Sequence, residues 1–401
     1  MPTDVVYMDN HATTRVDPRV VEAMLPCWGE NYGNPGSVNH AFGWEAKAAV
    51  DAAREQIAAA LGAQPREIVF TSGATESNNL ALRGVAERTR RKGNHLVSVS
   101  IEHKAVLDPL EKLGRRGFAV TLLDVTQAGS ERAGWLDPAC VADALRDDTL
   151  LVSVMLANNE IGVIQPLAEI ASACHERGVL LHCDATQAVG KIPVNVAALG
   201  VDLMSFTAHK LYGPKGIGAL YVRRSNPPVR LAAQIDGGGQ EGSMRSGTLN
   251  VPGIVGFAKA LELCLAEMPA EQQRLARLRQ RLHDGLISSV EGVTLNGPAL
   301  DAHDLQQPGL RLPGNLNLSF AWVDGEALMM AMKRLAVSSG SACTSANPEP
   351  SHVLRALGLS QDLTRASLRF GLGRFNSADD VEFAIQIVGE AVQRLRSLTS
   401  R

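Results

Sequence analysis

The 401-residue sequence lacks several features that would assign it to particular classes of protein. No apolar run approaches the roughly 18 residues that cross a membrane, so we expect no membrane partner. Acidic residues (42) nearly balance basic residues (39), and a net charge of −3 gives no general attraction to nucleic acid. Residues 1–15 lack the basic and apolar regions of a secretory signal. The six cysteines show no C-x-x-C pair and no disulfide-framework spacing, so we expect free thiols and a cytoplasmic location.

The residues that are present predict a folded α/β protein. Hydrophobic residues make up 45% of the chain and charged residues 20%, which is ordinary for a globular protein. Apolar segments of strand length alternate with helix-like stretches. The predicted strands cover 67–70, 95–100, 118–124, 150–156, 179–185, 202–207 and 218–224. This alternation favours a mostly parallel mixed sheet covered by helices on both faces.

The pattern changes after about residue 252, which predicts two domains. We expect a large domain of residues 15–255 and a smaller α+β domain formed by residues 1–14 and 256–401. A long helical stretch opens the second part of the chain. We expect it to be interrupted near Pro269, because proline lacks the N–H that a helix interior needs.

Polar residues follow several of the predicted strands. Gly73 comes after the first strand and precedes a helix that opens with Ala74 and Thr75, a local pattern suited to binding phosphate. The polar residues that follow the later strands are Asn158, Asn159, Asp184, Gln187, Thr207, His209 and Lys210. Since parallel sheets bind ligands at the carboxyl ends of their strands, we expect these side chains to meet at one edge.

Each of these residues also has an ordinary structural interpretation. Asp184 opens a DATQ sequence and could cap a helix, while Asn158 and Asn159 could be turn residues. His209 could be a half-buried histidine and Lys210 a surface lysine. Their combination favours a cofactor site: a lysine can form a Schiff base, and a carboxylate can pair with a pyridinium nitrogen. With a phosphate-binding turn, these groups indicate pyridoxal phosphate.

Cys343 lies in an unusual setting, within SSGSACTSANPEP at residues 338–350. A buried structural cysteine normally has apolar neighbours, whereas small and polar residues surround this one. The segment predicts either an unremarkable surface thiol or a reactive thiol on a long loop.

Motifs in the same order and with similar spacing resemble those of one enzyme family over nearly the whole chain. These motifs are DNHATT (9–14), SGATESNN, EHKAVLDPL, NNEIG, DATQAVGK, AHKLYGPKGIGALYVRR, RSGTLN, SSGSACTSANPEPSHVLRALGL and RFGLGRF. They are similar to the cysteine desulfurases of iron–sulfur cluster assembly, which are fold-type I pyridoxal-phosphate enzymes of the class V aminotransferase group.

The resemblance implies a role for each matching residue. Lys210 would bind the cofactor as a Schiff base, Asp184 would hold its ring nitrogen, and Gln187 its ring hydroxyl. His103 would stack over the ring and transfer protons, while Asn159 and Arg369 would bind the substrate carboxylate, Asn159 also contacting the cofactor. The implied phosphate ligands are Ala74, Thr75, Thr207, His209 and, from the other subunit of a homodimer, Thr248. His11 receives no role.

The implied reaction converts L-cysteine to L-alanine and leaves a persulfide on Cys343. Sulfur would pass to an acceptor or iron–sulfur scaffold protein, and Cys343 would contact a cluster on that partner only transiently, with no resident metal. Three alternatives stay open from the residues alone. They are another enzyme of the group, such as a selenocysteine lyase or an aminotransferase, an idle scaffold or sulfur carrier, and a papain-like thiol hydrolase.

Overall fold

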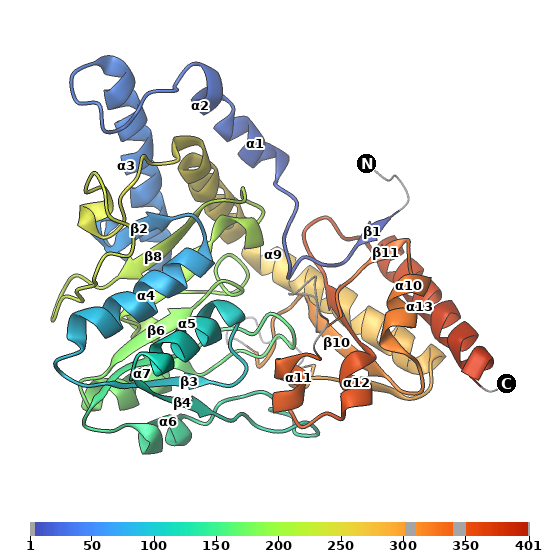
Figure 1. Ribbon diagram of the computed structural model, residues 1–401. Coiled ribbons are helices and arrows are strands. Elements are labelled where there is room, and N and C mark those ends of the chain that lie inside the picture. The colour runs from blue at the N-terminus through green and yellow to red at the C-terminus, as the bar shows by residue number, and fades with distance from the viewer. Residues whose placement is uncertain (1–4, 301–308, 340–349, 400–401) are drawn as a thin grey trace.

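A seven-stranded sheet forms the centre of the larger of two lobes in the computed structural model, which describes residues 5–300, 309–339 and 350–399 (Figure 1). The strand order is β2-β8-β7-β6-β5-β3-β4. The strands are β2 (Ile68–Thr71), β3 (His95–Val99), β4 (Ala119–Leu123), β5 (Thr149–Ser153), β6 (Leu180–Asp184), β7 (Leu203–Thr207) and β8 (Gly218–Val222). Neighbours from β7 to β4 are parallel, while β8 runs antiparallel to both β7 and β2. The predicted fold class, a mostly parallel mixed sheet, is confirmed.

Helices cover both faces of this sheet. The helices of the large lobe are α1 (Pro18–Met24), α2 (Pro26–Gly29), α3 (Ala41–Leu61), α4 (Ala74–Thr89), α5 (Lys104–Arg115), α6 (Pro138–Ala144), α7 (Leu167–Glu176) and α8 (Val196–Leu199). Successive strand residues point to opposite faces. In β6, Leu181 and Cys183 join the core that packs against α3 and α7. Asp184, next to Cys183, therefore faces α4, while Cys183 is buried in the core on the other face.

The small lobe has its own sheets and core. β10 (Asn315–Phe320) pairs antiparallel with β9 (Val293–Leu295) and β12 (Ser367–Gly371), and β1 (Val6–Tyr7) pairs with β11 (Leu335–Ala336). Its helices are α10 (Gly325–Ala331), α12 (Gln361–Arg365) and α13 (Ala378–Thr399), while α11 (His352–Ala356) packs Val353 and Leu354 into the large core. Because β1 lies in this lobe, residues 6–7 associate with the last part of the chain.

One long helix, α9 (Val251–Ser289), connects the lobes (Figure 1). Its first half packs into the large core as far as Cys264, and its second half packs into the small core from Leu275 onward. The two cores thus meet inside α9, beyond the boundary at residue 255 proposed from the sequence.

The predicted interruption of this helix near Pro269 is wrong, because α9 runs through that residue. Pro269 and Leu265, whose carbonyl loses its hydrogen bond, both lie on the exposed side of the helix. Water can therefore hydrate the freed carbonyl, and packing at both ends keeps the helix continuous.

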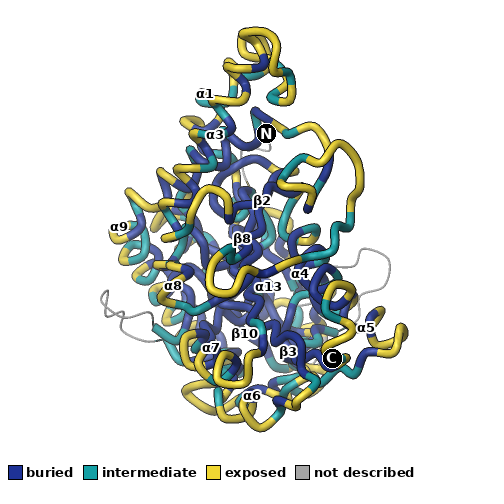
Figure 2. Tube along the Cα trace, turned by 90° about the vertical axis from the view of Figure 1, so that its left-hand side faces the viewer, coloured by how far each residue is buried: buried dark blue, intermediate teal, exposed yellow. Residues whose placement is uncertain are grey.

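Figure 2 shows burial concentrated in the sheet strands and the helix faces against them, with exposure along the outer loops. Within the described ranges of the chain, no helix is both long and apolar enough to cross a membrane.

Candidate active site

A cleft of about 700 Å³ lies at the carboxyl ends of β5, β6 and β7 and reaches the small lobe. The predicted residues that line it are Ala74, Thr75, His103, Asn159, Asp184, Gln187, Thr207, His209, Lys210 and Arg369. Two predicted residues are not among them. Thr248 is exposed and does not line the cleft in this chain, and Cys343 lies outside the described residues.

The Asp184 carboxylate is the anionic group at the base of the site. It is 4% exposed and ends β6 on the face toward α4. Asn78 Nδ2, from the second turn of α4, donates to Asp184 Oδ2 at 2.7 Å, and the Thr186 N–H donates to Oδ1 at 2.9 Å. The sequence analysis missed Asn78, although it lies one turn after the glycine that was noted. A buried amide on the sheet-facing side of that helix was the available signal.

The N-terminus of α4 forms the proposed phosphate side of the cleft. Gly73 is its N-cap, and a Cβ on neighbouring Gly218 would lie 2.7 Å from the Gly73 Cα, so this close approach requires glycine. Glu76 in the first turn accepts from the Ser72 N–H at 2.8 Å and from Arg245 Nε at 2.7 Å. Arg245 therefore neutralises the one carboxylate of the first turn, and the free N–H groups of Ala74 and Thr75 remain suited to an anion.

Lys210 follows β7 and reaches the N-terminal segment of the chain. Its Nζ donates to the carbonyl oxygens of His11, at 2.5 Å, and Ala12, at 2.6 Å. Gln187 Nε2 donates to the same His11 oxygen at 2.8 Å. His11, to which the sequence analysis gave no role, thus positions two site residues through its backbone carbonyl. A backbone contact has no side-chain signature, so the residue type could not reveal it.

His103 is the N-cap of α5, and its Nδ1 accepts from the Ala105 N–H at 3.0 Å. That hydrogen bond requires a lone pair on Nδ1, which leaves the proton of the neutral ring on Nε2. Burial lowers the pKa of His103 and the nearby Lys210 acts in the same direction, against an opposing effect of Asp184. The ring is therefore neutral near pH 7, with Nε2 available to a bound group.

Arg369 brings a cation from the small lobe to the edge of the cleft. It lies in β12, and its Nη2 donates to Asp9 Oδ1 at 2.7 Å, while Nη1 lies 3.4 Å from the Asn159 carbonyl oxygen. The buried Nε has no hydrogen-bond partner. The guanidinium is thus oriented by Asp9, which the sequence analysis missed, and retains donor capacity for a carboxylate.

Asn158 and Asn159 lie in different environments. The Asn158 side chain accepts from the N–H groups of Glu160 and Ile161 and donates to the Ile101 carbonyl, so it holds the turn. Asn159 lines the cleft. The turn-residue interpretation therefore holds for Asn158.

The donor set fits pyridoxal phosphate. A carboxylate, a lysine amine and a helix N-terminus occupy three sides of one cleft, and Thr186 Oγ1 and Asn78 Oδ1 are buried there without a hydrogen-bond partner. Among the described residues, no group of three His, Cys, Asp or Glu side chains could hold a metal ion.

Glu102 lies fully buried beside the site, with Oε1 accepting from the Met155 N–H and Oε2 without a partner. Burial raises the pKa of Glu102 well above its usual value of 4.5, and the charge of Asp184 acts in the same direction. The folded state therefore binds this proton more tightly than the unfolded state. Its contribution to stability is complete below about pH 4.5 and is lost as the pH rises toward the folded-state pKa.

We predict that Glu102→Gln keeps the fold and becomes increasingly more stable than wild type as the pH rises. The amide keeps the acceptor for Met155 but cannot ionise. The difference in the free energy of unfolding should grow as the pH rises above the usual glutamate pKa of 4.5 toward the raised folded-state pKa, by at most about 1.4 kcal/mol per pH unit. Urea unfolding at several pH values measures it, with the exposed Glu111→Gln as control. Parallel pH profiles for Glu102→Gln and wild type would contradict the prediction.

Comparison with known proteins agrees with this geometry. The family described as aminotransferase class-V matches residues 6–383. A relative from Anaeromyxobacter dehalogenans named cysteine desulfurase IscS is 58% identical over 394 residues, which are 98% of this chain and 94% of the relative. A solved structure described as a NifS-like protein has a TM-score of 0.87 and 37% identity, covering 98% of this chain and all of that one. A second, described as SspA in complex with cysteine, has a TM-score of 0.78 and 35% identity, covering 92% and 99%. The chain therefore belongs to the cysteine desulfurases of the class-V aminotransferase family.

Proposed function

We propose that this protein removes sulfur from L-cysteine, giving L-alanine and a persulfide on Cys343 that is passed on for iron–sulfur cluster assembly. The observation that carries the proposal is the single cleft where Lys210, Asp184 and Arg369 meet, although these residues are far apart in the sequence. The family and the names of its relatives favour this activity over the aminotransferase, idle scaffold and thiol hydrolase alternatives.

Pyridoxal phosphate, on which this family depends, supplies an electron sink that stabilises negative charge on the α-carbon of a bound amino acid. Asp184 would pair with the ring nitrogen, and Gln187 would reach the ring hydroxyl with the second hydrogen of its Nε2. The first turn of α4 would bind the phosphate together with Thr207 and His209. Thr207 Oγ1 donates to the Ile217 carbonyl at 2.9 Å, so its hydroxyl would rotate away from that carbonyl to donate to the phosphate.

Lys210 and His103 are the proposed proton-transfer residues. Lys210 would attach the cofactor, release it to the substrate amino group and then carry the α-proton on Nζ. Its hydrogen bonds to the carbonyls of residues 11 and 12 keep that nitrogen in the cleft. His103 would exchange protons with the substrate through Nε2, since Nδ1 is engaged by the backbone of α5.

Cys343 is the proposed sulfur acceptor. Its thiolate would attack the substrate sulfur, forming an S–S bond while the C–S bond breaks and its electron pair stays with carbon. Proton uptake by carbon completes L-alanine, so cysteine and one thiol become alanine and one persulfide. Of the described residues beside the Cys343 segment, Ser338 lines the cleft, while Ser351 bonds Glu160, which follows the cleft residue Asn159. Ser338 pairs with the Arg369 backbone, and Ser351 Oγ donates to Glu160 Oε2 at 2.5 Å.

A cytoplasmic location and a sulfur-accepting protein partner complete the proposal. The described cysteines Cys27, Cys140, Cys174, Cys183 and Cys264 are free thiols, in keeping with a reducing compartment. The partner would be a sulfur carrier or an iron–sulfur scaffold protein.

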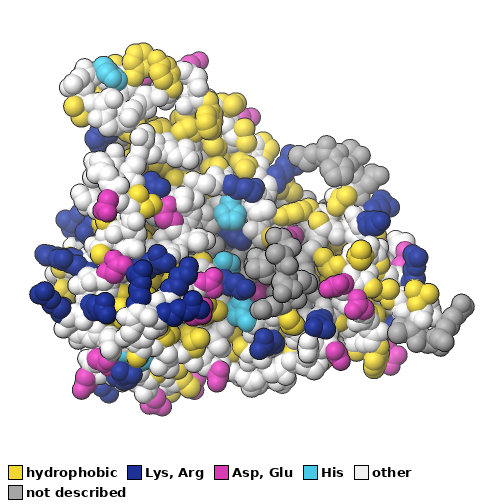
Figure 3. Space-filling view, in the orientation of Figure 1, with side chains coloured by type: hydrophobic (Ala, Val, Ile, Leu, Met, Phe, Trp, Pro, Cys, Tyr) yellow, Lys and Arg dark blue, Asp and Glu magenta, His cyan; other side chains and the backbone are white. Residues whose placement is uncertain are grey.

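A homodimer is the proposed assembly, with Thr248 completing the partner's phosphate site. Support comes from the tip formed by α1, α2 and the start of α3, where hydrophobic side chains gather on the surface (Figure 3). Exposed apolar residues of this tip are Leu25, Trp28, Tyr32, Val38, Phe42 and Trp44. Apolar surfaces of this kind commonly mark protein interfaces.

We predict that variants of Lys210 and Cys343 fail at different steps of the reaction. Lys210→Ala should neither attach cofactor covalently nor release alanine, so borohydride should fail to fix the cofactor to the chain. Cys343→Ala should keep the lysine-bound cofactor and its yellow colour but stall before the C–S bond breaks. In wild type treated with cysteine and no reductant, mass spectrometry should find one added sulfur on the Cys343 peptide. Alanine formation by Cys343→Ala at the wild-type rate would refute the assignment.

The second prediction concerns substrate binding by Arg369. Arg369→Ala should raise the KM for cysteine roughly 30- to 150-fold, since loss of one charged hydrogen-bonded partner costs roughly 2–3 kcal/mol. Cofactor colour should persist, because Arg369 is proposed to bind the substrate carboxylate and not the cofactor. Steady-state kinetics measures the effect, with the exposed Arg365→Ala as matched control. An unchanged KM would count against the role.

The third prediction tests the dimer and the role of Thr248 in trans. The protein should sediment as a dimer, and Thr248→Ala should weaken cofactor binding. Mixing Lys210→Ala with Thr248→Ala subunits should then restore activity, since each mixed dimer contains one site with both native residues. If Thr248 acts within its own chain, mixing should restore nothing. A fully active monomer would also exclude the proposal.

A further inference from the structure

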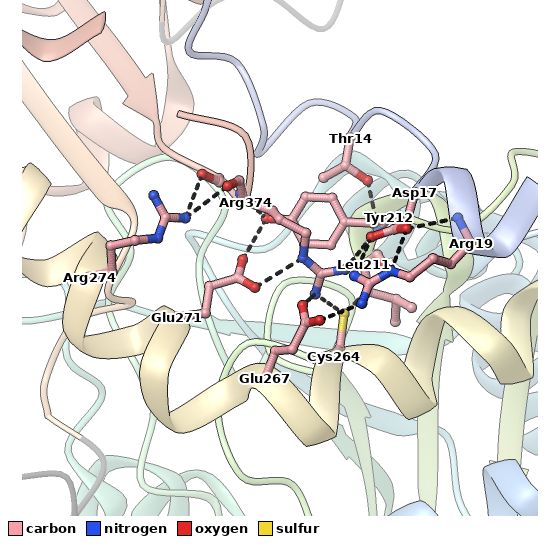
Figure 4. Close-up of polar contacts among 11 residues, drawn as sticks. Thr14, Asp17, Arg19, Leu211, Tyr212, Cys264, Glu267, Glu271, Arg274 and Arg374 are labelled. Carbon is pink, nitrogen blue, oxygen red and sulfur yellow. Dashed lines mark hydrogen bonds and ion pairs between the residues drawn. The ribbon is translucent and has the colours of Figure 1, made fainter. Parts of the chain in front are cut away.

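Arg374, in the loop after β12, joins three carboxylates where the two lobes meet (Figure 4). Its side chain is only 9% exposed. Nη1 lies 2.8 Å from Asp17 Oδ2, Nη2 lies 3.3 Å from Glu267 Oε2, and Nε lies 3.2 Å from Glu271 Oε2. A largely buried guanidinium needs such partners, because desolvation of an unpaired charge is unfavourable. We call this group of residues, together with Tyr212, the Arg374 cluster.

Tyr212 connects the rest of the Arg374 cluster to the loop that carries Lys210, which we call the lysine loop. Its hydroxyl donates to Glu271 Oε1 at 2.9 Å and accepts from the Arg374 N–H at 2.7 Å. The guanidinium also lies over the tyrosine ring, 4.3 Å from its centroid. Tyr212 is two residues after Lys210, so whatever holds its side chain also restrains the loop that carries the lysine.

The backbone of Tyr212 is strained, with φ of 63° in the left-handed region. Such a conformation in a bulky residue persists only when its surroundings hold it. The Tyr212 N–H donates to Thr14 Oγ1 at 2.8 Å, and its carbonyl accepts from the Asp17 N–H at 2.9 Å. Hydrogen bonds from Arg19 and Arg374 outweigh burial and hold the pKa of Asp17 well below its usual range. Asp17 therefore stays charged and holds both Arg374 and the strained residue.

The other end of the Arg374 cluster is fixed to the small lobe. Arg274, from α9, donates to the carbonyl oxygens of Asn376 at 2.6 Å, Arg374 at 3.0 Å and Gly373 at 3.3 Å. Arg369 lies five residues before Arg374, in strand β12, whose residues pair with β10. The loop is thus held between the strand of Arg369 and helix α9.

We propose that Arg374 is a positioning residue that fixes the separation between Lys210 and Arg369. An α-amino acid held at its carboxylate by Arg369 must present its amino group and α-carbon to Lys210 at a defined distance. Through Tyr212, Arg374 couples strand β12, which carries Arg369, to the loop that carries Lys210. This inference rests on the proposed function, because it assumes that Arg369 binds the carboxylate and Lys210 moves the α-proton.

Arg19 provides a matched control. It binds two of the same carboxylates, with Nη2 2.8 Å from Asp17 and Nη1 2.6 Å from Glu267, but its side chain is 46% exposed. Among the described residues, its side-chain hydrogen bonds and ion pairs go to Asp17 and Glu267 and not to Tyr212 or the loop at residues 373–376. Arg19→Gln therefore perturbs the same carboxylates without cutting the connection between Lys210 and Arg369.

The test measures exchange of the α-hydrogen of L-alanine in D₂O by NMR on the holoenzyme. This step needs the carboxylate and the α-carbon in register with Lys210 but does not use Cys343. At saturating alanine, Arg374→Gln and Tyr212→Phe should each slow exchange at least about tenfold while the visible absorbance of bound cofactor persists. Amide hydrogen exchange of residues 208–216 should rise in both variants. Arg19→Gln should match wild type in both measurements.

The outcomes distinguish failure of the positioning role from failure of the proposed function. Exchange at the wild-type rate in Arg374→Gln or Tyr212→Phe, with lowered thermal stability alone, would overturn the positioning role and leave an interlobe stabiliser. If Arg374→Gln does not fold, Tyr212→Phe decides, because it removes one hydroxyl and keeps the ring. If wild type neither exchanges alanine nor releases sulfur from cysteine, the proposed function itself fails.

Discussion

The buried carboxylate of Asp184 is the constraint on which the geometry of the site depends. A charge that is 4% exposed must be hydrogen-bonded, and the turn after its strand supplies the Thr186 N–H. The second partner is Asn78 of α4, so the requirement fixes that helix against the end of β6. The N-terminus of the same helix begins four residues earlier, at Ala74. One hydrogen bond thus sets the distance between the proposed pyridine and phosphate ends of the cleft.

The layer beneath this carboxylate is polar but neutral. His182, two residues earlier on the same face of β6, bonds Ser153 Oγ at 2.8 Å and Ser205 Oγ at 3.0 Å. Burial lowers the pKa of His182 to about 4, so the ring carries no charge near pH 7. The charge of Asp184 is therefore stabilised by amide donors, and His182 does not form an ion pair with it. That arrangement suits a carboxylate whose cationic partner is a protonated ring nitrogen.

The remaining groups depend on contacts between the lobes. The N-terminal segment supplies the His11 carbonyl for Lys210 and Gln187, and Asp9 for Arg369. Since β1 just before it pairs with β11 of the small lobe, this segment ties the small lobe to the lysine loop. The Arg374 cluster joins the same parts of the chain through Asp17 and Tyr212. Both connections act on Lys210 and Arg369, the two residues proposed to bind and react with the amino acid.

The sequence alone predicted the seven strands of the large sheet, the fold class and ten of the residues that line the cleft. Apolar strand segments, glycine turns and polar residues at strand ends are local signals. In a parallel sheet the carboxyl ends of the strands lie at one edge, so the polar residues that follow them lie close together. Local pattern misjudged Pro269, where packing at both ends of α9 keeps the helix continuous. Only the tertiary structure decided the partners. The Asn78–Asp184 bond, the His11 carbonyl, the Asp9–Arg369 pair and the Arg374 cluster join segments distant in the chain. Backbone carbonyls and long-range ion pairs leave no periodic trace, because their partners are set by how the elements pack and not by neighbouring residues.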